Sequence, residues 1–372
     1  MTITQMKKRE TICRKGETVR RIAYKQSRGI WSDLVVLTTS FFPFQIYPIV
    51  ITIVLFYLIV VRESLSLKQL LYPCCLATIL SMSCPLYYWK DLDRYNFMAK
   101  PMISWHKSVT VVLPSESFPR KTSGYVFAVH PHGRVFVSFS IILFFYRKWL
   151  MQPLASYNAT KKEEFGNALE INNKKCLSKS EQSLLDDSTN LFFGVTSTLF
   201  ALPVLRNVFG LIGLVSATKS VLKSILLQSN HVALLVGGVQ EVCLGTFNDK
   251  DILYLKKRKG FLKLAMETGS GVVPVYCFGE NRLFKHTNKT ILKCWKGVNR
   301  YVPIGAPFPV CGPFNLMIPY RGDLLMAFGE PLFPRSDETI DQFHGRYMLA
   351  IEELFQKFVK ESSSPNLKLE IL

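Results

Sequence analysis

The stretch Tyr125-Val-Phe-Ala-Val-His130-Pro-His132-Gly133 gives the clearest indication of how this chain folds. Its first five residues are apolar, β-branched or aromatic, which predicts a buried strand. Pro131 cannot donate a ladder hydrogen bond and Gly133 tolerates unusual backbone angles, so the strand should end in a tight turn. Open α/β sheets usually carry their chemistry at the carboxyl ends of their strands. Two histidines in that place therefore predict an enzyme.

Further strand patterns, each followed by glycine, lie at residues 232–236, 272–278 and 324–328. A helical pattern covers residues 255–267, and residues 340–360 predict a charged amphipathic helix. Alternation of strands and helices predicts an α/β fold in which helices cover the faces of a sheet.

The composition indicates contact with a membrane and with an anion. Hydrophobic residues make up 48% of the 372 residues and the mean hydropathy is +0.17, which is high for a soluble protein. The formal net charge of +19 implies an anionic partner such as nucleic acid, an acidic lipid surface or a polyphosphate such as coenzyme A. Nucleic acid is disfavoured because the basic residues are scattered and no binding motif accompanies them. The nine cysteines have no metal-binding spacing, as expected of reduced cysteines in a cytosol-facing protein.

The amino-terminal quarter predicts a membrane anchor. Residues 1–40 form a basic leader, and two runs that contain no charged residue follow it, from about 42 to 61 and from about 70 to 89. Each run approaches the ~20 residues that span a bilayer, so we expect a hydrophobic hairpin over residues 41–90. The basic leader places both ends of the hairpin in the cytosol. Prolines in both runs leave open a re-entrant hairpin, whereas a buried hairpin of a soluble protein is disfavoured.

Three segments of the remaining body, residues 91–372, differ in character. Residues 135–145 are almost all apolar and predict a helix buried behind the site or resting in the membrane. Residues 151–190 are polar and predict a solvated insertion. Residues 191–228 are apolar again, and we interpret them as an interfacial helix pair, with a layer of the core as the alternative.

The two histidines admit three roles: general base, metal ligands or structural pair. A metal site requires further ligands, and no other histidine of the sequence clusters with Asp or Glu. We therefore predict no metal and favour base catalysis by His132 or His130.

Two carboxylates follow other predicted strand ends. Gly237-Gly238-Val-Gln-Glu241 places Glu241 after a glycine turn, where it could orient a histidine and stabilise its imidazolium; the alternative is a surface glutamate. Phe278-Gly279-Glu280-Asn281 is a similar turn, in which Glu280 could assist the site or fix the turn.

A basic run, Lys256-Lys257-Arg258-Lys259, precedes Gly260 and Phe261. Charge runs usually form a solvated face, but a helical pattern continues from this one. Backbone N–H groups at a helix start, together with Arg258 and Lys259, would bind phosphate.

The order of these motifs resembles the type 2 diacylglycerol acyltransferase family, which includes monoacylglycerol and wax-alcohol acyltransferases. The resemblance covers roughly residues 40–360, and the four motifs together are specific although each alone is weak. Two features depart from the family: the longer connection at residues 151–190, and Val239 where alanine is usual.

The resemblance implies a glycerolipid-acyltransferase-like fold and an enzyme of the endoplasmic-reticulum membrane, with the lipid-droplet surface as a second location. It also implies transfer of a fatty acyl group from acyl-CoA, a co-substrate, to a lipid hydroxyl without a bound cofactor. The expected acceptor is diacylglycerol, with monoacylglycerol or a wax alcohol as alternatives, and a homo-oligomer is compatible with the sequence. The expected catalytic residues are His130, His132 and Glu241. The expected substrate-binding residues are Pro131, Gly133, Gly237, Gly238, Arg258, Lys259, Gly260, Phe261, Glu280 and Asn281.

Two other functions fit the sequence less well. Acylation of a lysophospholipid or glycerol phosphate is disfavoured because no Asp follows either histidine at the His-x-x-x-x-Asp spacing. A membrane lipid-binding protein without catalysis is disfavoured because both the histidine turn and the glycine–glycine–glutamate turn are present.

Overall fold

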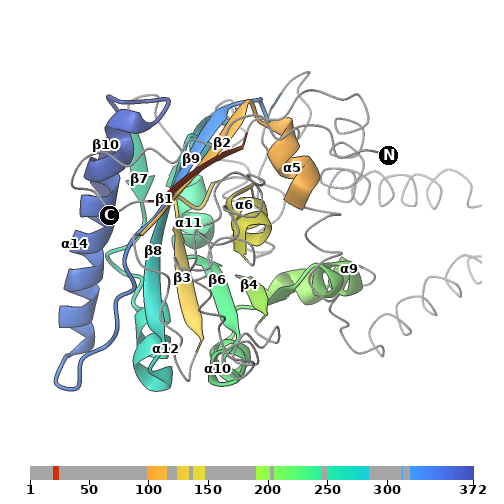
Figure 1. Cartoon of the computed structure of the whole chain (residues 1–372). Helices are drawn as coiled ribbons and strands as arrows, with labels where there is room; N and C mark the ends of the chain where they lie inside the picture. Colours follow the sequence, from red (N-terminus) through yellow and green to blue (C-terminus); the bar gives the residue numbers. More distant parts are fainter. Residues whose placement is uncertain are drawn as a thin grey trace, which may run out of the picture.

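The central feature of the fold is a sheet with helices on both faces (Figure 1). The computed structural model describes residues 20–24, 99–114, 124–133, 137–146, 190–201, 205–244, 250–284, 312 and 319–372. The sheet has the order β1-β2-β9-β8-β3-β6-β4-β5, and β10 and β7 form a second, two-stranded sheet. The strands are β1 Arg20–Tyr24, β2 Ser108–Leu113, β3 Tyr125–His130, β4 Leu191–Val195, β5 Leu214–Ser216, β6 His231–Leu235, β7 Lys250–Leu253, β8 Gly271–Phe278, β9 Asp323–Phe328 and β10 Lys368–Ile371.

The strand that ends in the two histidines lies at the centre of the sheet. β3 pairs in parallel with β8 on one side and with β6 on the other, and all six of its residues are buried. His130 is in register with Tyr276, and Val129 with Leu235. Because β4 also runs parallel to β6, the carboxyl ends of β3, β4, β6 and β8 meet at one edge of the sheet.

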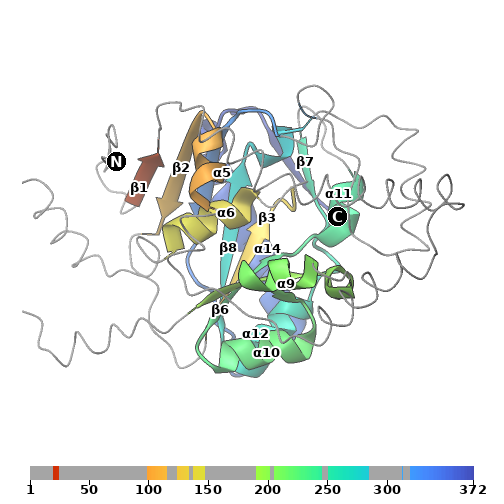
Figure 2. The same ribbon diagram turned by 90° about the vertical axis from the view of Figure 1, so that its right-hand side faces the viewer.

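Helices bury the two faces of the sheet in separate layers (Figures 1 and 2). One layer contains α5 Lys100–Trp105, α6 Val137–Phe145 and α9 Leu205–Leu211. The opposite layer contains α10 Lys219–Leu227, α12 Gly260–Thr268 and α14 Ile340–Phe358. The remaining helical segments are α11 Gly238–Leu244 and the 3₁₀ helices η4 Ser197–Ala201, η5 Glu280–Arg282 and η7 Val359–Glu361.

The boundaries of two helices follow from local chemistry. Thr339 caps α14, since its hydroxyl accepts from the Gln342 N–H and the Gln342 side chain accepts from the Thr339 N–H. α12 ends at Gly269, whose φ of 67° lies in the left-handed region that favours glycine.

The predicted α/β sheet with helices on its faces is confirmed. The strand patterns at 232–236, 272–278 and 324–328 correspond to β6, β8 and β9, and the carboxyl-terminal helix corresponds to α14. The apolar run 135–145 contains α6, which packs on the sheet behind the site. The helix expected over 255–267 begins only at Gly260, because the residues before it form a loop after β7.

The interpretation of residues 191–228 as an interfacial helix pair is wrong. This segment contributes β4 and β5 to the main sheet, and α9 and α10 pack against that sheet. Its continuous apolar sequence arises because β4 lies inside the parallel part of the sheet, with Phe193 buried in one core layer and Phe192 packed partly against the other. Part of the basic leader also enters the sheet, as β1 pairs antiparallel with β2.

The predicted hairpin over 41–90 lies outside the described residues. None of the helices among the described residues is long and apolar enough to cross a membrane. Apart from Asn190, the polar insertion over 151–190 also lies outside the described part of the chain.

We predict that α14 contributes to stability through its buried stripe. Ile351 is fully buried under the sheet, so Ile351→Ala should lower the free energy of unfolding by about 2–4 kcal/mol. Leu349 on the same helix is 60% exposed, and Leu349→Ala should cost less than about 0.5 kcal/mol. Denaturant unfolding of the purified chain would measure both changes. Equal losses in the two variants would contradict the observed orientation of α14.

Candidate active site

The turn after β3 brings its two histidines into different environments. The peptide bond between His130 and Pro131 is cis, and Gly133 has a φ of 62°. A Cβ atom on Gly133 would lie 2.7 Å from Glu280 Oε1, so glycine is needed here for space as well as for conformation. His130 is fully buried, whereas His132 is partly exposed and lines a cavity.

His130 is held from inside the protein. Its Nε2 lies 2.8 Å from the Tyr347 hydroxyl, which also lies 3.4 Å from the carbonyl oxygen of Ala128. Nδ1 has no hydrogen-bond partner among the described residues. Burial, together with the neighbouring His132, lowers the pKa of His130 to about 3. His130 is therefore neutral at physiological pH and is shielded from solvent.

His132 has the geometry of a general base. Its Nδ1 lies 3.1 Å from the carbonyl oxygen of Gly133, and since a carbonyl only accepts, this hydrogen bond requires the proton on Nδ1. The lone pair is then on Nε2. Burial lowers the pKa of His132, the hydrogen bond to Gly133 partly opposes this shift, and Arg258 lowers the pKa further. The basic form is therefore present at neutral pH.

Glu241 anchors the backbone of the histidine turn. It is buried in the first turn of α11, where Oε1 accepts from the His132 N–H at 2.5 Å and Oε2 from the Tyr254 N–H at 2.9 Å. Burial raises the pKa of Glu241 to about 7, although both hydrogen bonds favour the carboxylate. A Cβ atom on Gly237 would lie 2.0 Å from Oε2, which explains that glycine.

Glu241 lies next to a histidine, as predicted, but it does not contact the imidazole ring as expected. Both carboxylate oxygens accept hydrogen bonds from backbone amides, one of them that of His132, rather than from an imidazole ring. Nor is Glu241 a surface glutamate, because it is only 5% exposed.

The basic run lies at a helix start, as predicted, with Lys259 as the N-cap residue of α12. Arg258 Nη2 donates to the carbonyl oxygen of Gly237 at 3.2 Å and to Gln240 Oε1 at 3.4 Å. Lys259 forms an ion pair with Asp341 of α14. Arg258 thus joins this loop to the glycine turn of Glu241.

Three residues near Arg258 have different surroundings: Gly238 belongs to the glycine turn, Gly260 is at the surface and Phe261 is in the core. Gly238 has a φ of 63°, and a Cβ atom there would lie 3.2 Å from Arg258 Nη2. Gly260 is exposed, with nothing within 4 Å of its Cβ position. Phe261 is buried with its ring edge-on to that of Tyr347, 4.9 Å between centroids.

Glu280 and Asn281 face different partners. Glu280 is buried against Gly133, and its Oε1 accepts from the Ser138 N–H at 3.2 Å. Asn281 donates to Asp251 Oδ1 at 3.1 Å. Glu280 therefore supports the histidine turn, whereas Asn281 binds a buried carboxylate on β7.

The sequence did not reveal two groups behind the site. Asp251 is fully buried and accepts from the Tyr276 hydroxyl at 2.8 Å. An acidic residue directly before the apolar pair Ile252-Leu253 is the signal that could have identified it. Tyr347 lies on the amphipathic α14 like any core aromatic, so its sequence carried no signal for its contact with His130.

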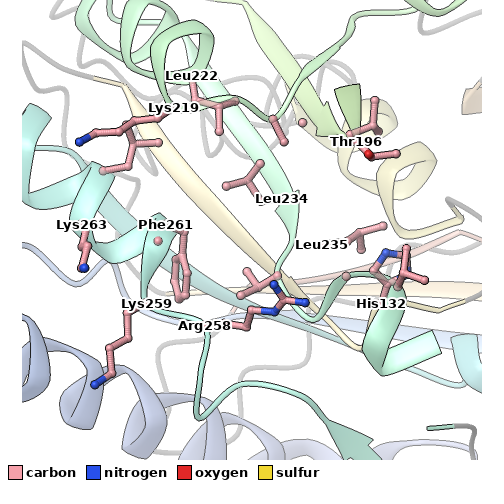
Figure 3. Close-up of a pocket in the computed structure, with 18 of the residues that line it drawn as sticks. His132, Thr196, Lys219, Leu222, Leu234, Leu235, Arg258, Lys259, Phe261 and Lys263 are labelled. Atoms are coloured by element: carbon pink, nitrogen blue, oxygen red, sulfur yellow. The ribbon is translucent and has the colours of Figure 1, made fainter. Parts of the chain in front are cut away.

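A cavity of about 630 Å³ opens beside His132 (Figure 3). Its lining combines aliphatic side chains from β4, η4, β6, α10 and α12 with cations of the basic loop, α10 and α12. In this view His132 and Lys263 lie on opposite sides, with Arg258 and Phe261 between them. Within the described part of the chain, no cluster of three or more His, Cys, Asp or Glu side chains could hold a metal ion.

We predict that Glu280 makes the stability of the protein pH-dependent. Burial raises its pKa from 4.5 to about 8, so between these pH values the folded state holds a proton that the unfolded state has released. Stability attributable to Glu280 should therefore fall as pH rises from about 5 to 8. Glu280→Gln should flatten the decline in Tm over this range, whereas Glu353→Gln at an exposed position of α14 should not. An identical decline in wild type and Glu280→Gln would contradict the assignment.

The chain is similar to several acyltransferases of known name. The model of the diacylglycerol acyltransferase family matches residues 184–372. "Diacylglycerol O-acyltransferase 2-like protein 6" of Homo sapiens is 32% identical over 47% of this chain and 57% of that protein. "Diacylglycerol O-acyltransferase 2" of Dictyostelium discoideum is 28% identical over 67% of this chain and 69% of that protein. "2-acylglycerol O-acyltransferase 3" of Homo sapiens is 29% identical over 47% of this chain and 56% of that protein.

The matched part thus spans between about half and two thirds of the length of these relatives. The acyltransferase PlsC of Thermotoga maritima aligns with 76% of this chain and 87% of its own at a TM-score of 0.37 and 11% identity, a likeness too weak to support a conclusion. The family model, in contrast, covers half of the sequence, including the Glu241, Arg258 and Glu280 motifs. This chain belongs to the diacylglycerol acyltransferase family.

Proposed function

We propose that the protein transfers a fatty acyl group from acyl-CoA to a lipid hydroxyl, with diacylglycerol as the acceptor and triacylglycerol as the product. One observation carries this proposal: the ring of His132 lines an apolar cavity with a cationic border, and the Gly133 carbonyl fixes the tautomer that has a basic Nε2. Family membership supports the same chemistry.

In the proposed mechanism, His132 Nε2 accepts the proton of the acceptor hydroxyl while the oxygen attacks the thioester carbonyl. A carbon–oxygen bond forms, the carbon–sulfur bond breaks, and the proton on His132 finally passes to the sulfur. A thiol with a pKa near ~8.5 leaves readily as thiolate, so no strong general acid is required. Glu241 holds the turn in place through its backbone. The reaction needs no bound cofactor or metal.

The cavity lining suggests how the substrates are held. Aliphatic side chains such as Leu199, Leu222 and Leu234 would contact the acyl chain, and cations at the border would bind phosphate. The predicted hairpin would place this cavity beside the bilayer of the endoplasmic reticulum or a lipid droplet, on the cytosolic side, where acyl-CoA and neutral lipid meet.

The acceptor is the least constrained part of the proposal. Relatives named 2-acylglycerol O-acyltransferases match this chain about as well as those named diacylglycerol acyltransferases, which supports monoacylglycerol as an alternative acceptor. A wax alcohol is a further alternative that rests on the sequence resemblance alone. A lipid-binding protein without catalysis is the alternative of a different class. The position of the His132 ring argues against this alternative. The histidine turn is held through its backbone and does not need the ring, yet the ring lines the cavity, where a base would be required.

We predict that His132→Ala separates catalysis from folding. Glu241 binds the backbone N–H of His132, which alanine retains, so the turn should persist while the base is lost. Turnover of labelled acyl-CoA should fall by about 10²–10⁴-fold with little change in Tm or membrane association. His130→Ala, in contrast, removes a buried hydrogen bond to Tyr347 and should lower Tm as well as turnover. Full turnover in His132→Ala would refute the assignment.

The acceptor can be identified in cells that lack neutral-lipid synthesis. Expression of the wild-type chain should restore triacylglycerol, and expression of His132→Ala should not. Labelled diacylglycerol formed from supplied monoacylglycerol, or wax ester formed from a supplied long-chain alcohol, would instead identify one of the alternative acceptors. If no lipid class returns although the protein is abundant and membrane-bound, the non-catalytic alternative would be favoured.

A further inference from the structure

The cations that border the cavity are not equivalent. Five of them belong to the lining: Lys219 of α10, Lys263 of α12, and Lys257, Arg258 and Lys259 of the loop before α12. The sequence pattern alone favoured Arg258 and Lys259 as the phosphate-binding residues. Their contacts in the structure show that both already have protein partners.

Arg258 is hydrogen-bonded to the glycine turn that precedes Glu241. Its Nη2 donates to the Gly237 carbonyl and to Gln240, and its guanidinium carbon lies 5.2 Å from the centre of the Tyr254 ring. It also lies close enough to His132 to lower the pKa of that histidine. In coenzyme A the whole pantetheine arm separates the thioester from the phosphates. A cation beside the catalytic base is therefore poorly placed to bind those phosphates.

Lys259 is committed to α14. Its ammonium group forms an ion pair with Asp341, and Figure 3 shows it directed toward that helix rather than toward His132. Lys259 and its partner are both at the surface. An anion would have to displace Asp341 to use this charge.

Lys257 and Lys263 are less constrained by protein contacts. Both are exposed cavity-lining residues, and neither forms an ion pair within 4 Å of a carboxylate of the described residues, although the charge of Lys263 acts at longer range to lower the pKa of Asp341. Lys263 lies on the side of the cavity opposite His132 (Figure 3). Lys219 of the adjacent α10 is held by Glu267 at 2.5 Å, and Glu267 also pairs with Lys223.

We propose that Lys257 and Lys263 bind the phosphate groups of the acyl donor, that Lys219 becomes a third contact only when it is released from Glu267, and that Arg258 is a positioning residue for the histidine turn. This inference rests on the proposed function, since it concerns the donor of that reaction. Lysine ammonium groups bind phosphate as point charges, and their flexible stems suit an exposed border.

Equilibrium binding of free coenzyme A to the full-length protein tests this assignment without any turnover. Lys257→Ala and Lys263→Ala should each weaken binding by about 2- to 5-fold, and the double variant by more, as expected for ion pairs between exposed groups. The losses should shrink at high salt because these charges are exposed. Lys360→Ala, at an exposed position after α14, is the matched control and should bind as wild type.

Two further comparisons sharpen the test. Glu267→Gln frees Lys219 and should tighten binding of coenzyme A. Dephospho-coenzyme A, which lacks the 3′-phosphate, should bind more weakly than coenzyme A to the wild type. That difference should diminish in whichever lysine variant has lost the 3′-phosphate contact.

Arg258→Gln should behave differently from the lysine variants. Affinity for coenzyme A should stay close to that of the wild type, while kcat falls because the glycine turn is no longer braced. Loss of the positive charge beside His132 should also raise the pKa of that residue and move the acid limb of the pH–rate profile upward. A purely structural role for Arg258 would not produce this shift.

The inference is overturned if the Lys257→Ala, Lys263→Ala double variant binds coenzyme A as tightly as wild type at low salt. It is also overturned if Arg258→Gln or Lys259→Ala alone abolishes binding, or if the wild-type protein binds no coenzyme A. If the lysine variants lose binding but the wild type transfers no acyl group, the inference stands and the proposed function fails. If the protein transfers acyl groups but the double variant has an unchanged KM for acyl-CoA, the proposed function stands and the inference fails.

Discussion

The structure around the site depends on one buried carboxylate that joins two segments through their backbones. Glu241, on the helix that follows β6, accepts from the N–H of His132 after β3 and from the N–H of Tyr254 after β7. Hydrogen bonds between charged groups and backbone amides are among the stronger ones in proteins, but a buried carboxyl also resists ionisation. The pKa of Glu241 is about 7 because burial raises it while the two backbone hydrogen bonds lower it. The turn is therefore fixed without the use of either imidazole ring.

This arrangement assigns distinct tasks to two histidines separated by a single proline. His130 ends the central strand and contacts Tyr347, so it belongs to the core between the sheet and α14. His132 is turned toward the cavity, where its backbone is held by Glu241 and its Nδ1 by Gly133. Around them, Gly133 and Gly237 leave the space that the carboxylates of Glu280 and Glu241 occupy. The glycines are thus explained by close approach of side chains as well as by backbone conformation.

Much of this arrangement follows from the sequence, because strand ends are marked by apolar runs that stop at glycine. Those signals locate the HPHG turn, the Glu241 turn and the Glu280 turn, and parallel pairing brings them to one edge. The signals fail where the apolar sequence has no clear periodicity: β4 is apolar on both faces and β5 is only three residues long, so their sequence does not distinguish them from helices. Long-range partners are also invisible. Nothing in the sequence shows that Tyr347 reaches His130, or that Asp341 pairs with Lys259.

In the proposed mechanism His132 acts as a neutral base, and no carboxylate stabilises its imidazolium. The pH dependence of kcat/KM for acyl-CoA tests this most directly, because the acid limb reports the pKa of the base in the free enzyme. Burial lowers the pKa of His132, so we predict a midpoint below 6.5, the ordinary value for histidine. A midpoint above 6.5 would mean that a carboxylate pairs with the ring, and would contradict the role of Glu241 as an anchor of the backbone alone.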